Sequence, residues 1–437
     1  MNGKCGDDML HQTDYAPEHS GTTDSLGRYY TKREISNQLV QQMAKIRPRR
    51  LLDLGAGSGH LSHAAINQWN VENLLTVDID RDASSFLKSA FHNIRQIDHN
   101  HIEADALDCR LPTLIQNAQP IDAAVCNPPF IVKKWRKGFG EILEDVGLAP
   151  TSVMLSTVDA ALIFLAQNLR LLKTNGTLGI IVPDTLVSSA RHYEFRKQLL
   201  RKYTIVKCVR LPRRSFHRTD ALAHILVISK STPNNRPIVV AALETDSSSM
   251  KTLCVDQDRA ALRLDYFFHS AELQVCRAKS ASLQLSDICK TIQRGSLTSA
   301  AVKRADFPVL HTRDLSIKDM GSWRDFSGYS SDANSLFNGK SVIRAKAGDI
   351  LIARVGRNLA TKVVGVKAGN PALSDCLYRI EVPRALRRTI LAQLSSDRGR
   401  KWIESKAYGV SAQQLPKREL EHFPVLRATK ASEKKSP

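Results

Sequence analysis

A short apolar run that ends in two prolines constrains this chain more than any other feature. Residues 121–126 have the composition of a buried strand, and Asn127-Pro128-Pro129-Phe130 follows directly. Proline has a fixed φ and no N–H to donate, so a sheet strand cannot continue through the pair. Because open α/β sheets bind ligands at the carboxyl ends of their strands, this tetrad is predicted to lie at a ligand-binding edge.

The tetrad carries the groups needed to hold a planar amino group. The side-chain oxygen of Asn127 and the carbonyl of Pro128 are acceptors for its two hydrogens, and Phe130 offers a face on which the attached ring can stack. Pro129 stiffens the backbone between them. Held in this way, the nitrogen moves toward tetrahedral geometry and its lone pair becomes available for attack.

A glycine-rich turn follows another predicted strand, residues 50–54, which contains Asp53. Gly55, Gly57 and Gly59 are spaced G-x-G-x-G, one residue shorter than the dinucleotide fingerprint, and no Lys-Ser or Lys-Thr follows to make a P-loop. Glycines at such a corner allow a tight turn and let a ligand approach the backbone closely. The pattern favours a nucleoside ligand without a phosphate, and S-adenosylmethionine fits.

Carboxylates end the next two predicted strands. Asp78 comes 23 positions after Gly55 and can accept hydrogen bonds from both hydroxyls of a ribose. Asp105 follows the third strand and can accept from the amino group of adenine. Taken alone, an acid such as Asp105 is more often a loop residue, so the interpretation depends on the joint pattern of three acid-bearing strand ends and the tetrad.

Together these residues resemble class I S-adenosylmethionine-dependent methyltransferases, and among them the gamma-class DNA adenine-N6 methyltransferases of restriction-modification systems. Lys32 stands where that family usually has proline, and Phe130 replaces a commoner tyrosine but retains the stacking face. Without the resemblance, Phe164 would fit a position in the core as well as a position facing the cofactor. The resemblance implies that the cofactor is bound by Thr31, Asp53, Gly55, Gly57, Asp78, Ile79, Asp105, Ala106 and Phe164, and that the catalytic residues are Asn127, Pro128, Pro129, Phe130 and Phe216.

The same resemblance implies an α/β fold with two parts. The first is a class I methyltransferase domain at residues 26–235, with a Rossmann-like seven-stranded sheet whose last strands pair antiparallel at one edge. A polar tail, residues 1–25, precedes it, and turn-rich stretches suggest a linker at 236–280. Residues 281–430 resemble a target-recognition half of type I restriction specificity subunits, which implies a smaller mixed α/β domain that reads DNA.

Positive charge is concentrated in the last third of the chain. Residues 281–437 contain 28 Lys and Arg against 14 Asp and Glu, a net charge of +14, which leaves +6 for the first 280 residues. A polyanion held mainly by the C-terminal part is the natural inference, with a merely solubilising surface as the alternative. Eight scattered cysteines without a C-x-x-C pair indicate reduced thiols and no metal site. The chain contains no apolar run of 18 residues, so no membrane span is predicted.

The sequence therefore predicts a site-specific methyltransferase that modifies the N6 amino group of adenine in double-stranded DNA after base flipping. An N4-cytosine methyltransferase would use the same tetrad. A protein-glutamine N5 methyltransferase also has Asn-Pro-Pro-aromatic, but it has no use for a basic reading domain. A DNA-binding or specificity factor without activity would not need Gly55, Asp78, Asp105 and Asn127 together. The expected partners are double-stranded DNA and a separate restriction endonuclease or defence-system protein, in the cytoplasm and nucleoid of a bacterium or archaeon.

Overall fold

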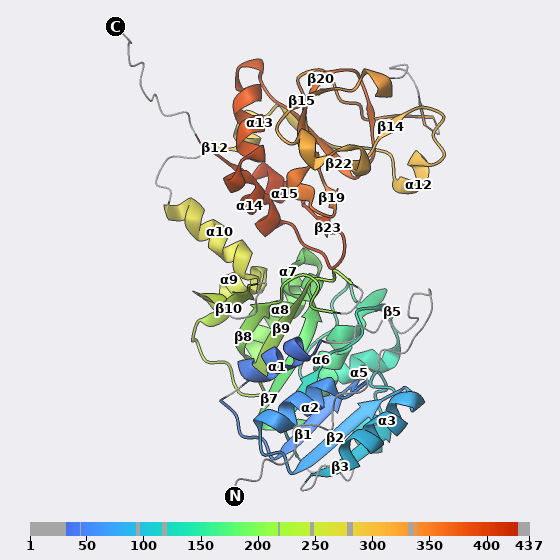
Figure 1. Cartoon of the computed structure of the whole chain (residues 1–437), viewed down its shortest axis with the longest axis vertical. Helices are drawn as coiled ribbons and strands as arrows, with labels where there is room; N and C mark the ends of the chain where they lie inside the picture. The colour runs from blue at the N-terminus through green and yellow to red at the C-terminus, as the bar shows by residue number, and fades with distance from the viewer. Residues whose placement is uncertain are drawn as a thin grey trace, which may run out of the picture. The chain divides into compact units, whose positions relative to one another are not determined.

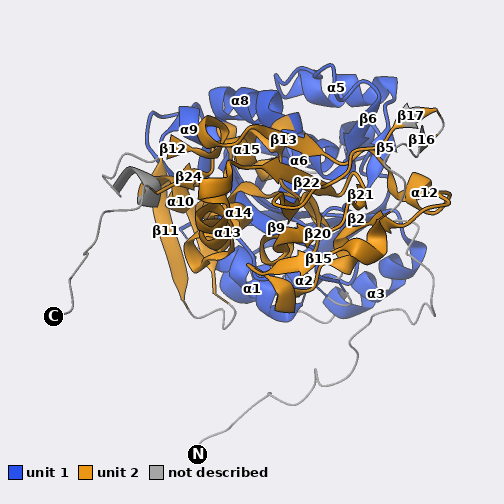
Figure 2. Cartoon of the chain, turned by 90° about the horizontal axis from the view of Figure 1, so that it is seen from above, with its two compact units in different colours: residues 1–186, 191–239, 256–261 blue, residues 187–190, 240–255, 262–437 orange. Residues whose placement is uncertain are grey.

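The computed structural model describes residues 32–43, 45–92, 97–115, 120–216, 219–244, 249–277, 283–330, 336–337 and 339–426. The predicted polar tail and Thr31 lie outside these residues. The chain divides into two compact units (Figure 2). Within the described part of the chain, no helix has the length and apolar character needed to cross a membrane. The first unit comprises Met1–Leu186, Arg191–Val239 and Asp256–Ala261, and the second comprises Val187–Ala190, Val240–Val255 and Leu262–Pro437.

A large mixed sheet is built from strands between residues 50 and 255 (Figure 1). Its strands are β1 (Arg50–Leu54), β2 (Asn73–Asp78), β3 (Asp98–Glu103), β4 (Ile121–Cys126), β7 (Leu172–Pro183), β8 (Thr204–Arg210), β9 (Ala223–Ser229), β10 (Ile238–Leu243) and β11 (Met250–Val255). They are ordered β11-β10-β8-β9-β7-β4-β1-β2-β3. The strands from β7 to β3 are parallel, and β9 is antiparallel to both β7 and β8. The predicted Rossmann-like α/β arrangement, with antiparallel strands toward one edge, is confirmed, and β10 and β11 extend it to nine strands.

Helices alternate with the strands of this sheet. They are α1 (Arg33–Gln42), α2 (His60–Gln68), α3 (Arg81–His92), α4 (Leu111–Leu114), α5 (Lys137–Asp145), α6 (Ala160–Leu171), α7 (Asp184–Ser188) and α8 (Tyr193–Lys202), with a short hairpin of β5 (Val132–Lys134) and β6 (Thr157–Asp159). A Cβ atom on Gly179 of β7 would lie 2.2 Å from Met43 Sδ and 2.9 Å from Leu39 Cδ2. The absence of a side chain at Gly179 therefore lets the end of α1 pack directly on the middle of the sheet.

Residues 236–280, which we expected to be a linker, contain regular structure. They include β10, β11, α9 (Gln257–Leu262) and α10 (Tyr266–Arg277). The turn-rich stretch 231–237 lies between β9 and β10, so its composition reflects a connection between two strands. Within this region the chain also passes several times from one compact unit to the other.

A buried lysine fixes α10 to α14 (Asp397–Lys406) within the second unit. Lys406 is 5% exposed, and its ammonium lies 3.0 Å from Glu272 Oε1 and 3.8 Å from the centre of the Phe268 ring. Burial lowers the pKa of this ammonium. Arg263 covers the same ring at 4.6 Å and donates to the Lys406 carbonyl at 3.0 Å. The residues around α10 thus belong structurally to the second unit.

The second unit contains a five-stranded sheet ordered β13-β22-β18-β20-β15. Its strands are β13 (Thr291–Arg294), β15 (Trp323–Asp325), β18 (Ile350–Ala353), β20 (Val363–Ala368) and β22 (Leu377–Glu381). Alternate residues of β18 enter two different cores: Ile350 and Ile352 pack in the cluster of Leu391 and Trp402, whereas Leu351 packs in the cluster of Phe326. Apolar side chains therefore cover both faces, one of them with α13 (Arg387–Ser395) and α14.

The glycine that begins α2 offers a test of packing in the first unit. Gly59 has φ +74, and a Cβ atom there would lie 2.8 Å from Leu87 Cδ2 and 3.0 Å from Phe91 Cε2 of α3. Gly57 also has a positive φ, of +51, but its Cβ would meet nothing within 4 Å. We expect Gly59→Ala to lower the free energy of unfolding more than Gly57→Ala, by about 1–3 kcal/mol, because only Gly59→Ala overpacks the core.

Urea denaturation of both variants and the parent protein measures this difference. Equal losses of stability in the two variants would show that backbone strain alone, and not the contact with α3, requires glycine at position 59.

Candidate functional site

Three neighbouring strands of the first unit deliver the predicted residues to one cavity. Because β2, β1 and β4 are parallel and in register, their carboxyl ends lie at the same edge of the sheet. Gly55, Asp78 and Asn127 follow or end these strands and line one cavity of about 420 Å³. The cavity is lined by Gly55, Ala56, Gly57, Ser58, His60, Leu61, Asp78, Ile79, Ala104, Asp105, Ala106, Leu107, Asn127, Pro129, Ile131, Lys133, Lys134, Arg136 and Phe164.

The glycine turn forms part of the cavity wall, and its members serve different purposes. Gly55 donates its N–H to the Val77 carbonyl at 2.8 Å, and its φ is +77. A Cβ atom there would lie 3.1 Å from Cε1 of Phe164, so the ring of α6 packs over this glycine. Gly57 faces open space, which leaves room for a ligand against its backbone.

Asp78 holds the glycine turn while remaining able to bind a ligand. It is 9% exposed, and its two oxygens accept from the N–H groups of Gly57 at 2.7 Å and Asp80 at 2.9 Å. Each carboxylate oxygen has a further lone pair, so both can still accept from ligand hydroxyls. Ile79 beside it is 52% exposed and lines the cavity, which offers an apolar surface to a ring.

Asp105 lies on the loop after β3 and is held from two sides. Its Oδ1 accepts from the N–H of Leu107 at 2.9 Å, and its Oδ2 lies 3.6 Å from Arg136 Nη2. Gln167 of α6 is fully buried and donates to the Ala106 carbonyl at 3.0 Å. Gln167 was not identified from the sequence, although two adjacent amides, Gln167 and Asn168, within a largely apolar helix were an available signal.

Asp53 differs from the other predicted cofactor residues that the structure describes, because it does not line the cavity. It is 1% exposed, and its Oδ2 accepts from Oγ of Ser62 at 2.6 Å and from the N–H of Ser62 at 3.2 Å. Burial raises the pKa of Asp53 to about 7. These contacts hold the first turn of α2 behind the glycine turn, and a direct contact of Asp53 with a cofactor stays a prediction.

The tetrad is divided between the cavity and the protein interior. Asn127 and Pro129 line the cavity, whereas Pro128 is buried and is not among the lining residues. Phe130 is half-buried, and its ring meets the Phe216 ring edge-on, with 5.9 Å between centroids and 80° between planes. The structure therefore brings the two predicted aromatic residues together, although they are far apart in sequence.

Lys32, the residue that departs from the resembled family, contacts the connector that carries Phe216. Its ammonium donates to the Arg214 carbonyl at 2.8 Å, and Arg214 has a left-handed backbone with φ +64. Ser215 Oγ donates to the Pro212 carbonyl at 2.6 Å. The start of α1 and an internal turn thus both hold the segment leading to Phe216.

Three cations line the cavity from the segment after the tetrad. Lys133 and Lys134 lie on β5, and Arg136 stacks on the Phe139 ring at 4.7 Å. Residues 131–150 contain the strand β5 and the helix α5. Arg191 donates to the Thr157 carbonyl of β6 at 2.6 Å, which fixes the hairpin at its other strand.

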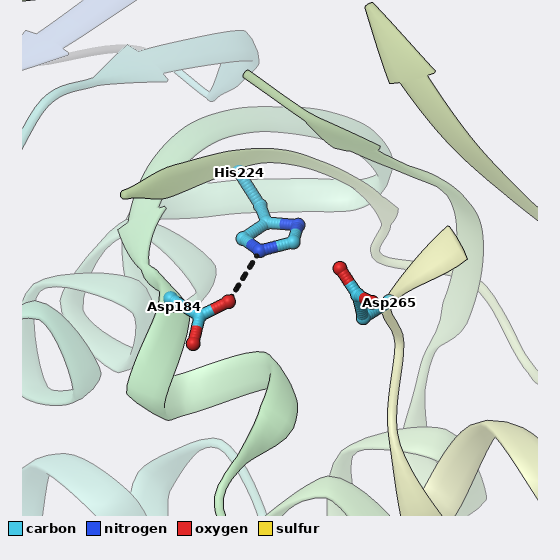
Figure 3. A group of neighbouring side chains, drawn as sticks. All are labelled: Asp184, His224 and Asp265. Carbon is cyan, nitrogen blue, oxygen red and sulfur yellow. Dashed lines mark hydrogen bonds and ion pairs between the residues drawn. The ribbon is translucent and has the colours of Figure 1, made fainter. Parts of the chain in front are cut away.

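A separate pair of titratable side chains is buried away from the cavity lining. Asp184, at the start of α7, and His224 of β9 are 1% and 0% exposed, with 3.0 Å between Oδ1 and Nε2 (Figure 3). Asp265, which is also drawn in Figure 3, belongs to the second unit, where its Oδ1 accepts from the N–H of Phe268 at 3.0 Å.

Comparison with known proteins places the cavity in a family context. The model of the N-6 DNA Methylase family matches residues 13–290, well over half of the chain. The rRNA N(6)-adenosine-methyltransferase metl-5 of Caenorhabditis elegans is 30% identical over 115 residues, which cover 25% of this chain and 51% of that protein. The matched part of this chain thus spans about half the length of that relative.

Two solved structures are similar to this chain. The type IIG restriction endonuclease BpuSI aligns with 92% of this chain and 59% of its own, at 12% identity and a TM-score of 0.51. A modification subunit of a putative type I restriction enzyme from Vibrio vulnificus aligns with 52% of this chain and 49% of its own, at 18% identity and a TM-score of 0.42.

Asp53→Asn tests the effect of the buried acid on stability. The folded-state pKa of about 7 lies above the ordinary value of 3.8, so between these pH values the folded protein binds more protons than the unfolded chain. Stability therefore falls as pH rises through this window. Above the window the total loss of stability is about 4 kcal/mol. Asparagine keeps an acceptor for Ser62 and cannot ionise, so we expect the variant to gain stability relative to the parent as pH rises.

Urea midpoints of both proteins from about pH 4 to about pH 8 measure the effect. Parallel curves for the parent and the variant would show that Asp53 is not protonated in the folded protein.

Proposed function

This chain belongs to the N-6 DNA methylase family, and from that premise we propose that it transfers a methyl group from S-adenosylmethionine to the N6 amino group of adenine at specific sites in double-stranded DNA. The observation that carries the proposal is the shared cavity of Asp78 and Asn127. It combines groups suited to a nucleoside with an amide suited to an exocyclic amine. The gamma-class order of motifs supports the same assignment.

The residues around the cavity fit S-adenosylmethionine. Asp78 would accept from the ribose hydroxyls, Ile79 would cover the adenine ring, and Asp105 would accept from the adenine amino group. Gly57 leaves its backbone accessible, and about 420 Å³ is within the ordinary size of small-molecule sites, roughly 300–1,000 Å³. When bound, S-adenosylmethionine supplies a methyl group on a positively charged sulfur.

Asn127 and Pro128 act by positioning the target nitrogen. The Asn127 side-chain oxygen and the Pro128 carbonyl accept the two amino hydrogens, which directs the nitrogen lone pair into the cavity. Such positioning lowers the barrier without a general base, because the amino group can lose its extra proton to water after transfer. The tight end of β4 at the two prolines keeps both acceptors in a fixed relation.

Phe130 offers the accessible surface for the extruded base. Phe216 is only 2% exposed, so most of its ring is covered by protein and it supports Phe130 from the side. Stacking offsets part of the cost of unpairing, which is on the order of a few kcal/mol. In this assignment Phe216 is a positioning residue that acts through Phe130.

The second unit supports DNA as the substrate. Most of the net positive charge of the chain lies in residues 281–437, and the unit presents a mixed α/β module suited to target recognition. We assign it the role of a type I specificity-like recognition domain, and restriction or phage defence with a separate endonuclease as its setting. The name of the relative metl-5 specifies rRNA, so RNA is the competing nucleic acid to test.

Transfer from tritiated S-adenosylmethionine to duplex DNA and to RNA tests the function. We expect label in duplex DNA, and mass spectrometry of the digested product should identify N6-methyladenine. Labelled N4-methylcytosine would assign the alternative base, and label only in RNA would contradict the proposal.

Asn127→Ala removes one of the two proposed acceptors. We expect the transfer rate to fall by at least about a hundredfold, since loss of a positioned polar contact of this kind costs roughly 3 kcal/mol or more in the transition state. Cofactor affinity, measured by calorimetry, should change little, because the amide is directed at the base. Asn67→Ala, on the exposed face of α2, is the matched control and should keep full activity. Full activity of Asn127→Ala would refute the mechanism.

Phe130→Ala tests stacking on the extruded base. We expect KM for paired duplex DNA to rise more than kcat falls, since the ring contributes about 1–3 kcal/mol to base capture. The defect should shrink when the target adenine is placed in a mismatch, because an unpaired base costs less to extrude. An equal defect on paired and mismatched substrates would argue against this role.

A further inference from the structure

One end of the sheet in the second unit gathers cations from segments that are far apart in sequence. β13 ends at Arg294, which pairs in register with Tyr378, and β18 ends at Ala353, which pairs with Leu377. Arg354 follows β18, and Lys362 precedes the antiparallel strand β20. All of these positions therefore lie at the same end of the sheet, where the strands begin or finish.

A single carboxylate holds two of these cations together. Asp375 precedes β22 at the same end, and its Oδ2 lies 2.5 Å from Arg294 Nη2 and 3.6 Å from Arg354 Nη2. Arg354 is 9% exposed and also donates to the Asp375 carbonyl, whereas the Arg294 side chain is 53% exposed. One negative charge thus serves two guanidinium groups, and an excess of positive charge reaches the surface.

Arg357 and Asn358 stand on a turn just beyond this cluster, and both are exposed. Asn358 has φ +52, and its carbonyl accepts from the N–H of Thr361 at 3.0 Å and from Thr361 Oγ1 at 2.8 Å. Leu359 and Ala360 follow at 1% and 0% exposure, so they anchor the turn in the core. The two exposed side chains therefore project from a fixed backbone.

Arg313 extends the positive surface beside the turn. Thr312 precedes it, and its Oγ1 would lie 4.0 Å from a Cβ atom on Gly356, so the two segments are neighbours. Lys362 donates to the Thr312 carbonyl at 2.6 Å, which ties this segment to the sheet. The Arg313 side chain is 77% exposed, and its Nε forms a long ion pair of 3.9 Å with Oδ1 of Asp314. Because an exposed ion pair of this kind is weak, the guanidinium can still bind a phosphate.

We propose that Arg357 and Asn358 read base edges of the target DNA and that Arg294 and Arg313 contact the phosphates beside them. This inference rests on the proposed function, because it assumes duplex DNA as the substrate. Arginine can bond the O6 and N7 atoms of guanine in a bidentate manner, and asparagine the N6 and N7 atoms of adenine. Base reading needs side chains on an ordered backbone, which the Thr361 bonds and the buried Leu359 provide.

The test compares the full-length variants Arg357→Ala, Asn358→Gly and Arg313→Ala with the parent. Asn358→Gly removes the amide but keeps a residue that tolerates φ +52, so the turn is preserved. Lys367→Ala is the control, because Lys367 is exposed near the opposite end of β20. Binding to a pool of random duplexes, followed by sequencing of the bound fraction, gives the motif of each protein, and thermal unfolding confirms that each is folded.

Arg357→Ala and Asn358→Gly should each relax the motif at one position, with discrimination reduced roughly 10- to 100-fold. Arg313→Ala should keep the motif, weaken binding to all sequences, and reduce the slope of log affinity against log salt by about 1. Lys367→Ala should change neither. A parental motif in folded Arg357→Ala and Asn358→Gly would overturn the reading assignment, and an unchanged salt slope in Arg313→Ala would overturn the phosphate assignment.

The same experiment separates this inference from the proposed function. The binding selection needs no methyl transfer, so a relaxed motif in the variants would support the reading turn even if the parent transfers no methyl group. Methylation by the parent combined with unchanged motifs in both turn variants would support the function and reject the turn.

Discussion

The parallel register of β2, β1 and β4 is the constraint on which the candidate site depends. At the amino ends of β1 and β4, Asp122 accepts from the N–H groups of Arg49 and Arg50 at 2.9 Å each, which fixes the two strands relative to each other. The carboxyl ends then meet at one edge, and three unrelated chain segments contribute to one cavity. A shift of one residue in β4 would turn each of its side chains to the opposite face and move Asn127 away from Asp78.

The order of strand ends could be predicted from sequence because each end is a local feature. A short apolar run followed by glycine, acid or proline is visible within ten residues, and parallel pairing brings such ends together without further information. Asp53 shows the limit of this reasoning. It lies one residue before the end of β1, and side chains alternate along a strand, so it points into the protein toward Ser62 while the residues just after the strand face the cavity.

Contacts between distant segments were not predictable in the same way. The regular structure within 236–280 was not predictable because turn residues between two sheet strands have the same composition as a domain boundary. The edge contact of Phe130 with Phe216 depends on a connector whose path only the folded chain reveals. In the second unit, β12 (Leu283–Gln284) pairs with β24 (Pro424–Val425), so elements of two residues each are stabilised by partners about 140 positions away. Patterns in short windows cannot identify such pairs.

Left-handed backbone occurs both in the turn before Phe216 and in the proposed base-reading turn. Among the described residues, the non-glycine residues with positive φ are Asn175, Arg214 and Asn358. Asparagine adopts this conformation readily, and Asn175 lies within β7 before its pairing with β9. Arginine has no such advantage, so contacts from elsewhere must stabilise Arg214, and the bond from Lys32 to its carbonyl is one of them. A lysine at position 32 therefore has a use that proline, without a donor, could not supply.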